Sequence, residues 1–275
     1  MRRMWVAAAC ALLGITGAQA QSFDVKLTLA YNVFVVGEPV LIQAEVLNMS
    51  RDLLDIGSPG SKSAFFVEVT RGDRLDEMQP SNKEPFVQSF QLPPGETFRY
   101  RLELDKWFRL AQEGRYIAQV IVVHGGMRYA SAKKSFDVVP GMQIGSGIQM
   151  FVSKENLRRQ FKLVYWHRNQ VDRLFLRIED EPGARIWDSV DLGSFMRGTP
   201  PKLDISPDGE ITVVHRATQD GFLRTVMWSL PNSMEVVERN SLVDPEISAS
   251  QRVNALYGEG GENKEEKKKA WWKIW

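Results

Sequence analysis

The stretch Leu92–Val123, LPPGETFRYRLELDKWFRLAQEGRYIAQVIVV, contains the two clearest β-strand patterns of the chain and the corner between them. From Thr97 onward, apolar and charged residues alternate with the period of two that a half-buried strand requires. The apolar members are Phe98, Tyr100, Leu102 and Leu104. Gly114 permits a tight turn, and the alternation then resumes. The apolar members there are Tyr116, Ala118, Val120 and Val122. These patterns predict two antiparallel strands of a β-sandwich.

The rest of the first half shows the same alternation, interrupted by turn residues. Further strands are predicted at Phe23–Leu29, Val40–Val46, Leu53–Ile56, Phe65–Val69 and Ser135–Val139. Gly37-Glu38-Pro39 is expected to form a turn, and Pro140-Gly141 to mark a domain boundary. We therefore expect an all-β first domain over residues 22–141.

The corner sequence Gln112–Ala118, QEGRYIA, resembles the D-x-G-x-Y-x-C corner of immunoglobulin-like domains. Tyr116 occupies the position of the corner tyrosine. Gln112 replaces the acidic residue and Ala118 replaces the cysteine, so no inter-sheet disulfide is implied. The resemblance implies a bacterial secreted immunoglobulin-like or fibronectin type III-like sandwich, similar also to macroglobulin-type domains, over about Phe23–Pro140. Such a resemblance concerns the fold and leaves the function open.

Residues 1–20 have the pattern of a secretory signal peptide. Two arginines precede an apolar run, Trp5–Ile15, and the small residues Ala18-Gln19-Ala20 suit cleavage before Gln21. The run is too short to span a bilayer. We expect an exported protein, periplasmic or extracellular, of a bacterial envelope. Cys10 lies inside the apolar run, which argues against a lipid-modified cysteine.

Composition excludes several classes of function. Removal of the two signal-peptide arginines leaves 33 basic and 34 acidic residues, a balance that gives no support to nucleic-acid binding. Cys10 is the only cysteine, so the mature chain has no thiol and no disulfide. Stability must therefore come from apolar cores, for which the roughly 255 remaining residues allow two domains of ordinary size.

The second half, residues 148–245, contains an approximate internal repeat. Val164–Arg168 followed by Leu174–Arg177 recurs about 48 residues later as Val213–Arg216 followed by Phe222–Arg224. Units of three or four short strands at such a period resemble β-propeller blades, but two units cannot close a propeller. The alternatives are a compact sandwich or barrel of two related meanders, which we favour, or blades completed by another copy of the chain.

Residues 246–275 are predicted to form a flexible linker and a tryptophan-rich tail. Gly258–Asn263 is polar and glycine-rich, and three tryptophans, Trp271, Trp272 and Trp275, lie within the last five residues. Tryptophan suits sites with one wet and one apolar side. These three residues are the predicted partner-binding residues. The tail can dock on the protein's own β-domain, on a protein partner or on a membrane surface, or stay free.

Few residues indicate catalysis or metal binding. The histidines His124, His167 and His215 lack the local spacing of a zinc site, although the last two occupy equivalent repeat positions. Glu179-Asp180-Glu181 and Asp204 with Asp208 are possible calcium ligands, but both groups adjoin turn sequences. Gly145-Ser146-Gly147 lacks the spacing of a nucleophile elbow. We predict no catalytic residue, no metal and no cofactor.

The sequence favours a non-enzymatic exported interaction or scaffold protein that binds an envelope protein. The alternative is a carbohydrate-binding module, which needs several aromatic rings exposed together on one sheet face. The candidate aromatic residues are Tyr165, Trp166, Phe175, Trp187 and Trp228. Tyr165 and Trp166 are neighbours on a strand and point to opposite faces, so core packing is the more common use of such residues.

Overall fold

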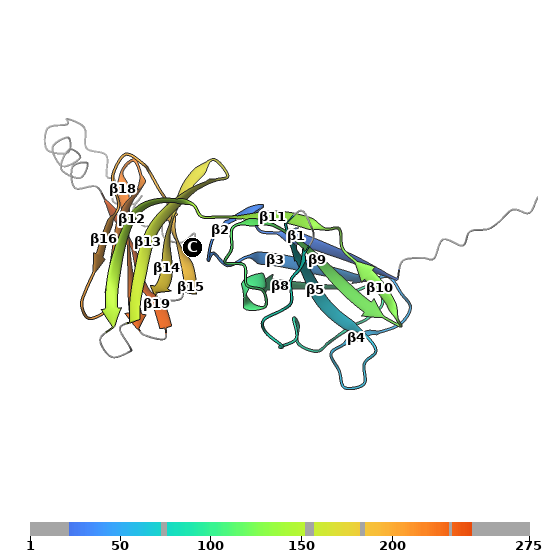
Figure 1. Cartoon of the computed structure of the whole chain (residues 1–275). Helices are drawn as coiled ribbons and strands as arrows, with labels where there is room; N and C mark the ends of the chain where they lie inside the picture. The colour runs from blue at the N-terminus through green and yellow to red at the C-terminus, as the bar shows by residue number, and fades with distance from the viewer. Residues whose placement is uncertain (1–21, 73–75, 152–156, 182–184, 231–232, 244–275) are drawn as a thin grey trace, which may run out of the picture. The chain divides into compact units, whose positions relative to one another are not determined.

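The computed structural model describes residues 22–72, 76–151, 157–181, 185–230 and 233–243 (Figure 1). These residues form strands β1 to β19 and one short 3-10 helix, η1 (Leu104–Lys106). The predicted all-β fold class is therefore confirmed. Within the described ranges, no helix has the length and apolar character needed to cross a membrane.

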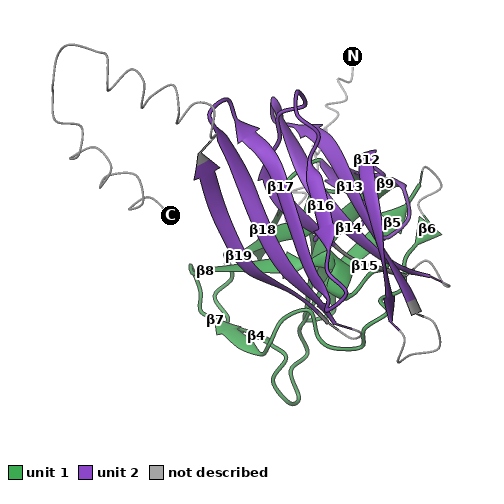
Figure 2. Cartoon of the chain, turned by 90° about the vertical axis from the view of Figure 1, so that its left-hand side faces the viewer, with its two compact units in different colours: residues 1–32, 40–109, 115–136 green, residues 33–39, 110–114, 137–275 purple. Residues whose placement is uncertain are grey.

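The chain divides into two compact units, coloured separately in Figure 2. Unit 1 consists of residues 1–32, 40–109 and 115–136. Unit 2 consists of residues 33–39, 110–114 and 137–275. The short segment 33–39 thus belongs to unit 2 although it lies between two strands of unit 1 in the sequence.

Unit 1 contains two main sheets and a short two-stranded ribbon. One sheet has the order β1-β3-β8 and is antiparallel, with strands β1 (Phe23–Leu29), β3 (Leu41–Asn48) and β8 (Thr97–Glu103). The other main sheet contains β5 (Ala64–Arg71), β6 (Asp76–Glu77), β9 (Gly114–His124), β10 (Met127–Ala130) and β11 (Lys134–Val139). It also includes β2 (Val33–Val35), whose residues belong to unit 2 and pair in parallel with Asp137–Val139 of β11. The ribbon pairs β4 (Leu54–Ile56) with β7 (Phe90–Leu92). Alternate apolar residues of these strands form the core, as period-two burial requires.

The two strands predicted most clearly, β8 and β9, lie in different sheets of unit 1 and are not paired with each other. Tyr116 on β9 is completely buried and stacks on Phe136, with ring centroids 5.5 Å apart. On β8, Leu102 is buried but Tyr100 is exposed, because β8 is an edge strand. Burial along this strand is thus only partly what its alternation predicts.

Asn48, at the end of β3, organises the turn that follows. Its buried amide nitrogen donates to the carbonyl oxygens of Asp52 and Leu92, both at 2.9 Å. Its carbonyl oxygen accepts bonds from the backbone nitrogen of Ser50 at 2.9 Å and from the Ser50 hydroxyl at 2.7 Å. The amide is therefore fully used inside the fold, where it holds the turn after β3.

Most of unit 2 is a sandwich of two four-stranded antiparallel meanders. The first sheet is β12 (Met142–Phe151), β13 (Leu157–Arg168), β14 (Val171–Glu181) and β15 (Arg185–Ser194). The second is β16 (Lys202–Ile205), β17 (Glu210–Thr218), β18 (Gly221–Leu230) and β19 (Ser233–Val243). The sequence repeat corresponds to the two central strands of each sheet.

One apolar core lies between these two sheets. The first sheet contributes Phe161, Leu163, Leu174, Leu176, Ile178 and Leu192, and the second contributes Ile211, Val213 and Met227. Phe195, just after β15, completes the core. A shared core of this kind fits the favoured interpretation of two related meanders packed together.

Strand β12 begins six residues before the predicted start of the second half. It lies beside β16 of the other sheet, as Figure 1 shows. A Cβ atom on Gly147 would overlap the Cδ1 atom of Ile205 and approach Leu203 Cδ2 to 3.3 Å. Gly147 therefore serves close packing of the two sheets, which gives the Gly-Ser-Gly sequence a structural reason.

Candidate functional site

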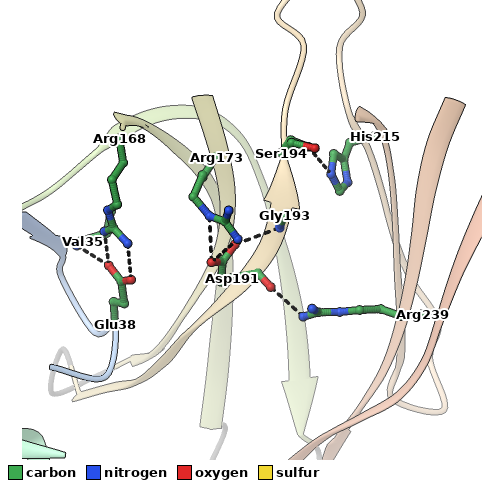
Figure 3. Close-up of polar contacts among 9 residues, drawn as sticks. All are labelled: Val35, Glu38, Arg168, Arg173, Asp191, Gly193, Ser194, His215 and Arg239. Carbon is green, nitrogen blue, oxygen red and sulfur yellow. Dashed lines mark hydrogen bonds and ion pairs between the residues drawn. The ribbon is translucent and has the colours of Figure 1, made fainter. Parts of the chain in front are cut away.

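Segment 33–39 is fastened to the first sheet of unit 2 by a buried ion pair (Figure 3). Glu38 accepts two bonds from the Arg168 guanidinium, Oε1 from Nη1 at 2.7 Å and Oε2 from Nη2 at 2.6 Å. The backbone nitrogen of Val35 also donates to Glu38 Oε2, at 2.9 Å. Both charged side chains are buried. This geometry is the bidentate one in which arginine and carboxylate interact most strongly.

Apolar and backbone contacts surround the ion pair. Val35 packs in a small buried cluster with Val164 and Phe175, and Trp166 covers this cluster. Ser189 adds two bonds, from its hydroxyl to the Val36 carbonyl at 2.6 Å and from its backbone nitrogen to the Gly37 carbonyl at 2.9 Å. We name residues 33–39 with these partners the N-terminal clamp. The sequence predicts only a turn at residues 37–39.

A bulge in β15 creates a second polar cluster, also drawn in Figure 3. Asp191 Oδ2 accepts from Arg173 Nε at 2.9 Å and from Arg173 Nη2 at 2.7 Å. Asp191 Oδ1 accepts from the backbone nitrogen of Gly193 at 2.8 Å, and the Asp191 carbonyl accepts from Arg239 Nη2 at 2.6 Å. Arg239 belongs to β19, so this cluster connects the edge strands of the two sheets.

His215 is a buried histidine next to this cluster. Its Nε2 atom lies 3.0 Å from the carbonyl oxygen of Ser194, to which it donates. Burial in the sandwich lowers the pKa of His215 below its ordinary value, and the charge of Arg239 lowers the pKa further, although the bond to Ser194 opposes this shift. Burial therefore favours the neutral form of the imidazole.

His167, the repeat equivalent of His215, has different partners and is exposed. His167 Nδ1 lies 2.8 Å from Asp172 Oδ1, and Asp172 also forms an ion pair with Arg197. The Arg197 bond is the main cause that lowers the pKa of Asp172. Arg197 lies over the ring of Tyr165, 5.0 Å from its centroid. The two histidines share no partner, so the repeat does not bring them together in a site.

Glu179 and Asp180, two of the acidic residues considered for calcium, are neutralised by basic neighbours instead. Glu179 binds Lys162 at 2.6 Å and Arg177 at 2.7 Å, and Asp180 binds the fully buried Arg159 at 2.7 Å. Arg159 also donates to Ser229 Oγ at 3.1 Å and to the Leu230 carbonyl at 2.8 Å. Across the described ranges, no group of three or more His, Cys, Asp or Glu residues is placed to hold a metal ion.

The candidate sugar-binding aromatic residues do not gather on one exposed face. Tyr165 packs against the main core of unit 2, Phe175 is completely buried, and Trp166 covers the clamp cluster. Trp228 on β18 is exposed. The side chain of Trp187 is not among those the structure describes. The carbohydrate alternative therefore gains no support from the described aromatic side chains.

The strongest exposed apolar features lie on edge strands of unit 2. On β19, Val236, Val237 and Leu242 are 42%, 55% and 41% exposed. On β12, four large apolar side chains are also exposed. The sequence pattern does not indicate that these residues are exposed, because exposure on an edge strand depends on which strands pair. The predicted partner-binding residues Trp271, Trp272 and Trp275 lie outside the described residues.

Comparisons with known proteins provide no family for this chain. No family model and no curated protein sequence matches it. The sporulation control protein Spo0M from Bacillus subtilis aligns over 86% of this chain and 96% of its own, with 11% identity and a TM-score of 0.27. A DUF4784 family protein from Bacteroides caccae aligns over 79% and 70%, with 8% identity and a TM-score of 0.20. These similarities are too weak to carry an argument about fold or function.

Proposed function

We propose that the chain is an exported, non-enzymatic interaction or scaffold protein of the bacterial envelope that binds a protein partner. The observation that carries this proposal is the edge strand β19. Within the described structure, β19 forms a ladder with β18 on one side only. An edge strand presents unpaired backbone groups, to which an extended segment of another protein can add as a further strand.

The side chains of β19 suit such a partner. Each residue from 235 to 242 is exposed, and three of them are large and apolar. Glu235, Glu238 and Arg239 lie between these apolar residues and supply charges that select a partner and its register. Main-chain bonds would provide affinity, while the apolar side chains and the charges would provide specificity.

The proposed tail contact is a second element of the same function. The segment 246–275 begins three residues after the end of β19, so we expect a partner held by the strand to lie within reach of Trp271, Trp272 and Trp275. Linking two weak contacts in this way raises the overall affinity without any change in either contact.

The test is capture of partners from an envelope extract by the exported chain and by a Val237→Lys variant. Val237 is the most exposed apolar residue of β19 and occupies its bulge, so the substitution spares the core. A matched control is Met127→Lys, which changes a similarly exposed residue on β10 of unit 1. We expect a specific protein that is retained by the wild type and the control and lost with Val237→Lys. Equal capture by all three proteins, or capture of nothing, would reject the proposal.

A separate experiment tests the cellular location of the protein and the contact made by its tail. Fractionation of the native exported protein is compared with that of a chain ending at Gly258. Sedimentation of the full chain with envelope membranes, and release of the shorter chain, would support a tail contact with the envelope. A shorter chain that stays in the same fraction but melts earlier would show that the tail docks on the protein itself.

A further inference from the structure

Strand β12 has a palindromic sequence. Residues Met142–Met150 read MQIGSGIQM, which is the same in both directions about Ser146. An antiparallel pair of identical strands related by a two-fold axis places residue i of one copy opposite its mirror position in the other. In β12 each residue would then face a residue of its own type.

The large residues of the palindrome are exposed in matched pairs. Met142 and Met150 are 58% and 57% exposed, and Ile144 and Ile148 are 37% and 43% exposed. Met142 accepts a bond from the Tyr165 hydroxyl at 2.9 Å, whereas packing within the chain gives no reason for apolar side chains at the other three positions. Gly147 differs, since its lack of a side chain is explained by the contact with Ile205.

The second edge of β12 has no hydrogen-bonded strand beside it, although β12 lies next to β16 of the other sheet. It is the terminal strand of its sheet and, among the described residues, it pairs only with β13. Ile148 and Met150 stand opposite Gln160 and Arg158 of β13, while Gln149 between them is opposite the buried Arg159. Ile148 and Met150 therefore lie on the sheet face that points away from the core.

β12 also lacks the usual protection of edge strands. Natural edge strands are commonly guarded against pairing by charged residues or proline. The other terminal strands of the two sheets, β15, β16 and β19, all contain charged residues. The ten residues of β12 include no charged residue and no proline.

From these observations, we infer that a second copy of this chain pairs with β12 through an antiparallel, two-fold symmetric contact centred on Ser146. Ile144 of each copy lies opposite Ile148 of the other, and Gly145 lies opposite Gly147. The two four-stranded sheets then join into one continuous sheet. Like apolar pairs opposite each other stabilise an antiparallel ladder, and no like charges meet.

A bulge sets the limits of this contact. The register of β12 against β13 shifts between Gln143 and Gly145, which leaves Ile144 in the bulge and Gly145–Met150 as the regular part of the strand. The central pairs, Gly145 opposite Gly147 and Ser146 opposite its own copy, lie entirely in this regular part. Pairs that involve Met142, Gln143 or Ile144 reach the bulge and contribute less.

The first test is sedimentation of the full chain over a range of concentrations. We expect a monomer–dimer equilibrium whose dissociation constant rises at least about tenfold in an Ile148→Lys variant, because a symmetric contact contains each substitution twice. Val171→Lys is the control, since Val171 is 45% exposed on β14 of the same unit. A chain that stays monomeric, or a dimer equally sensitive to both substitutions or to neither, would overturn the proposal.

The second test fixes the register by disulfide formation. In a chain with Cys10→Ser, a Ser146→Cys variant has one thiol, which the two-fold axis places opposite its own copy. Opposed residues in an antiparallel ladder have Cα atoms about 4.5–5.5 Å apart, within the range for a disulfide. A Met150→Cys variant places its thiol opposite Met142 instead. We expect mild oxidation to link Ser146→Cys and not Met150→Cys. Equal linking of the two variants, or linking of Met150→Cys alone, would overturn the register and the proposal.

This inference is independent of the partner surface on β19. Self-association is read from variants of β12, and partner capture is read from a variant of β19. Loss of one with retention of the other therefore identifies which proposal has failed.

Discussion

Neutralisation of Glu38 should destabilise unit 2, because the partner of Glu38 is a buried guanidinium. In a Glu38→Gln variant the side chain keeps its shape and can still accept the bond from Val35. Arg168 would keep its positive charge inside the clamp without the two carboxylate bonds of 2.7 and 2.6 Å. Nearby aromatic rings, Phe34 at 5.9 Å and Phe175 at 5.6 Å from the guanidinium carbon, offset only part of this loss.

The expected magnitude follows from the burial of the pair. Removal of one partner from a buried ion pair costs about 3–5 kcal/mol, because the remaining charge is left uncompensated. At about 3 °C per kcal/mol for a unit of this size, the melting temperature of unit 2 should fall by roughly 10 °C. Calorimetry and urea unfolding of the full chain measure these quantities.

Two further variants serve as controls for Glu38→Gln. Glu45→Gln removes a pair of similar length, Glu45 with Arg99 at 2.7 Å, but this pair is exposed. Its loss should cost at most about 0.5–1 kcal/mol. Glu38→Gln combined with Arg168→Met removes both charges, and the double variant should be more stable than Glu38→Gln alone. If unit 2 of Glu38→Gln unfolds at the same urea concentration as unit 2 of the wild type, the clamp does not stabilise unit 2.

Three other predictions concern single residues. Gly209→Ala should destabilise unit 2 by about 2 kcal/mol or more. The backbone there has φ of +99°, and a Cβ atom would lie 2.7 Å from the Ser229 carbonyl oxygen. Urea unfolding measures the effect, and an unchanged midpoint would contradict this prediction. Asn48→Ala should lower the unfolding free energy of unit 1 by about 2–3 kcal/mol, since the carbonyl oxygens of Asp52 and Leu92 lose their donor. Asn82→Ala is the control and should change this free energy little, because the Asn82 amide hydrogen-bonds the exposed Glu84. Because burial lowers the pKa of folded His215, its contribution is fully present above the unfolded pKa of about 6.5 and is lost as the pH falls below that value. The difference in melting temperature between wild type and His215→Gln should therefore change between pH 7 and pH 5, and a constant difference would refute the assignment.

Local pattern was enough to determine that this chain is all-β. The alternation around Thr97 and Tyr116 predicts strands because one face of a strand packs on the core while the other faces water. This alternation can be read from neighbouring residues alone. The repeat around Val164 and Val213 likewise indicated two related meanders. A turn at Asp208-Gly209 can be predicted for the same reason, since the backbone conformations that glycine adopts are a local property.

Tertiary structure alone decided which residues are brought together and which are left exposed. Nothing in the sequence near Glu38 indicates a bond to Arg168, which lies 130 residues later. The equivalent repeat positions of His167 and His215 gave no hint that one is exposed beside Asp172 and the other buried beneath Ser194. The palindrome of β12 acquires meaning only once that strand is known to end its sheet. Strand order and long-range pairing arise from contacts distant in sequence, so local patterns determine the elements while their packing determines the surfaces available for binding.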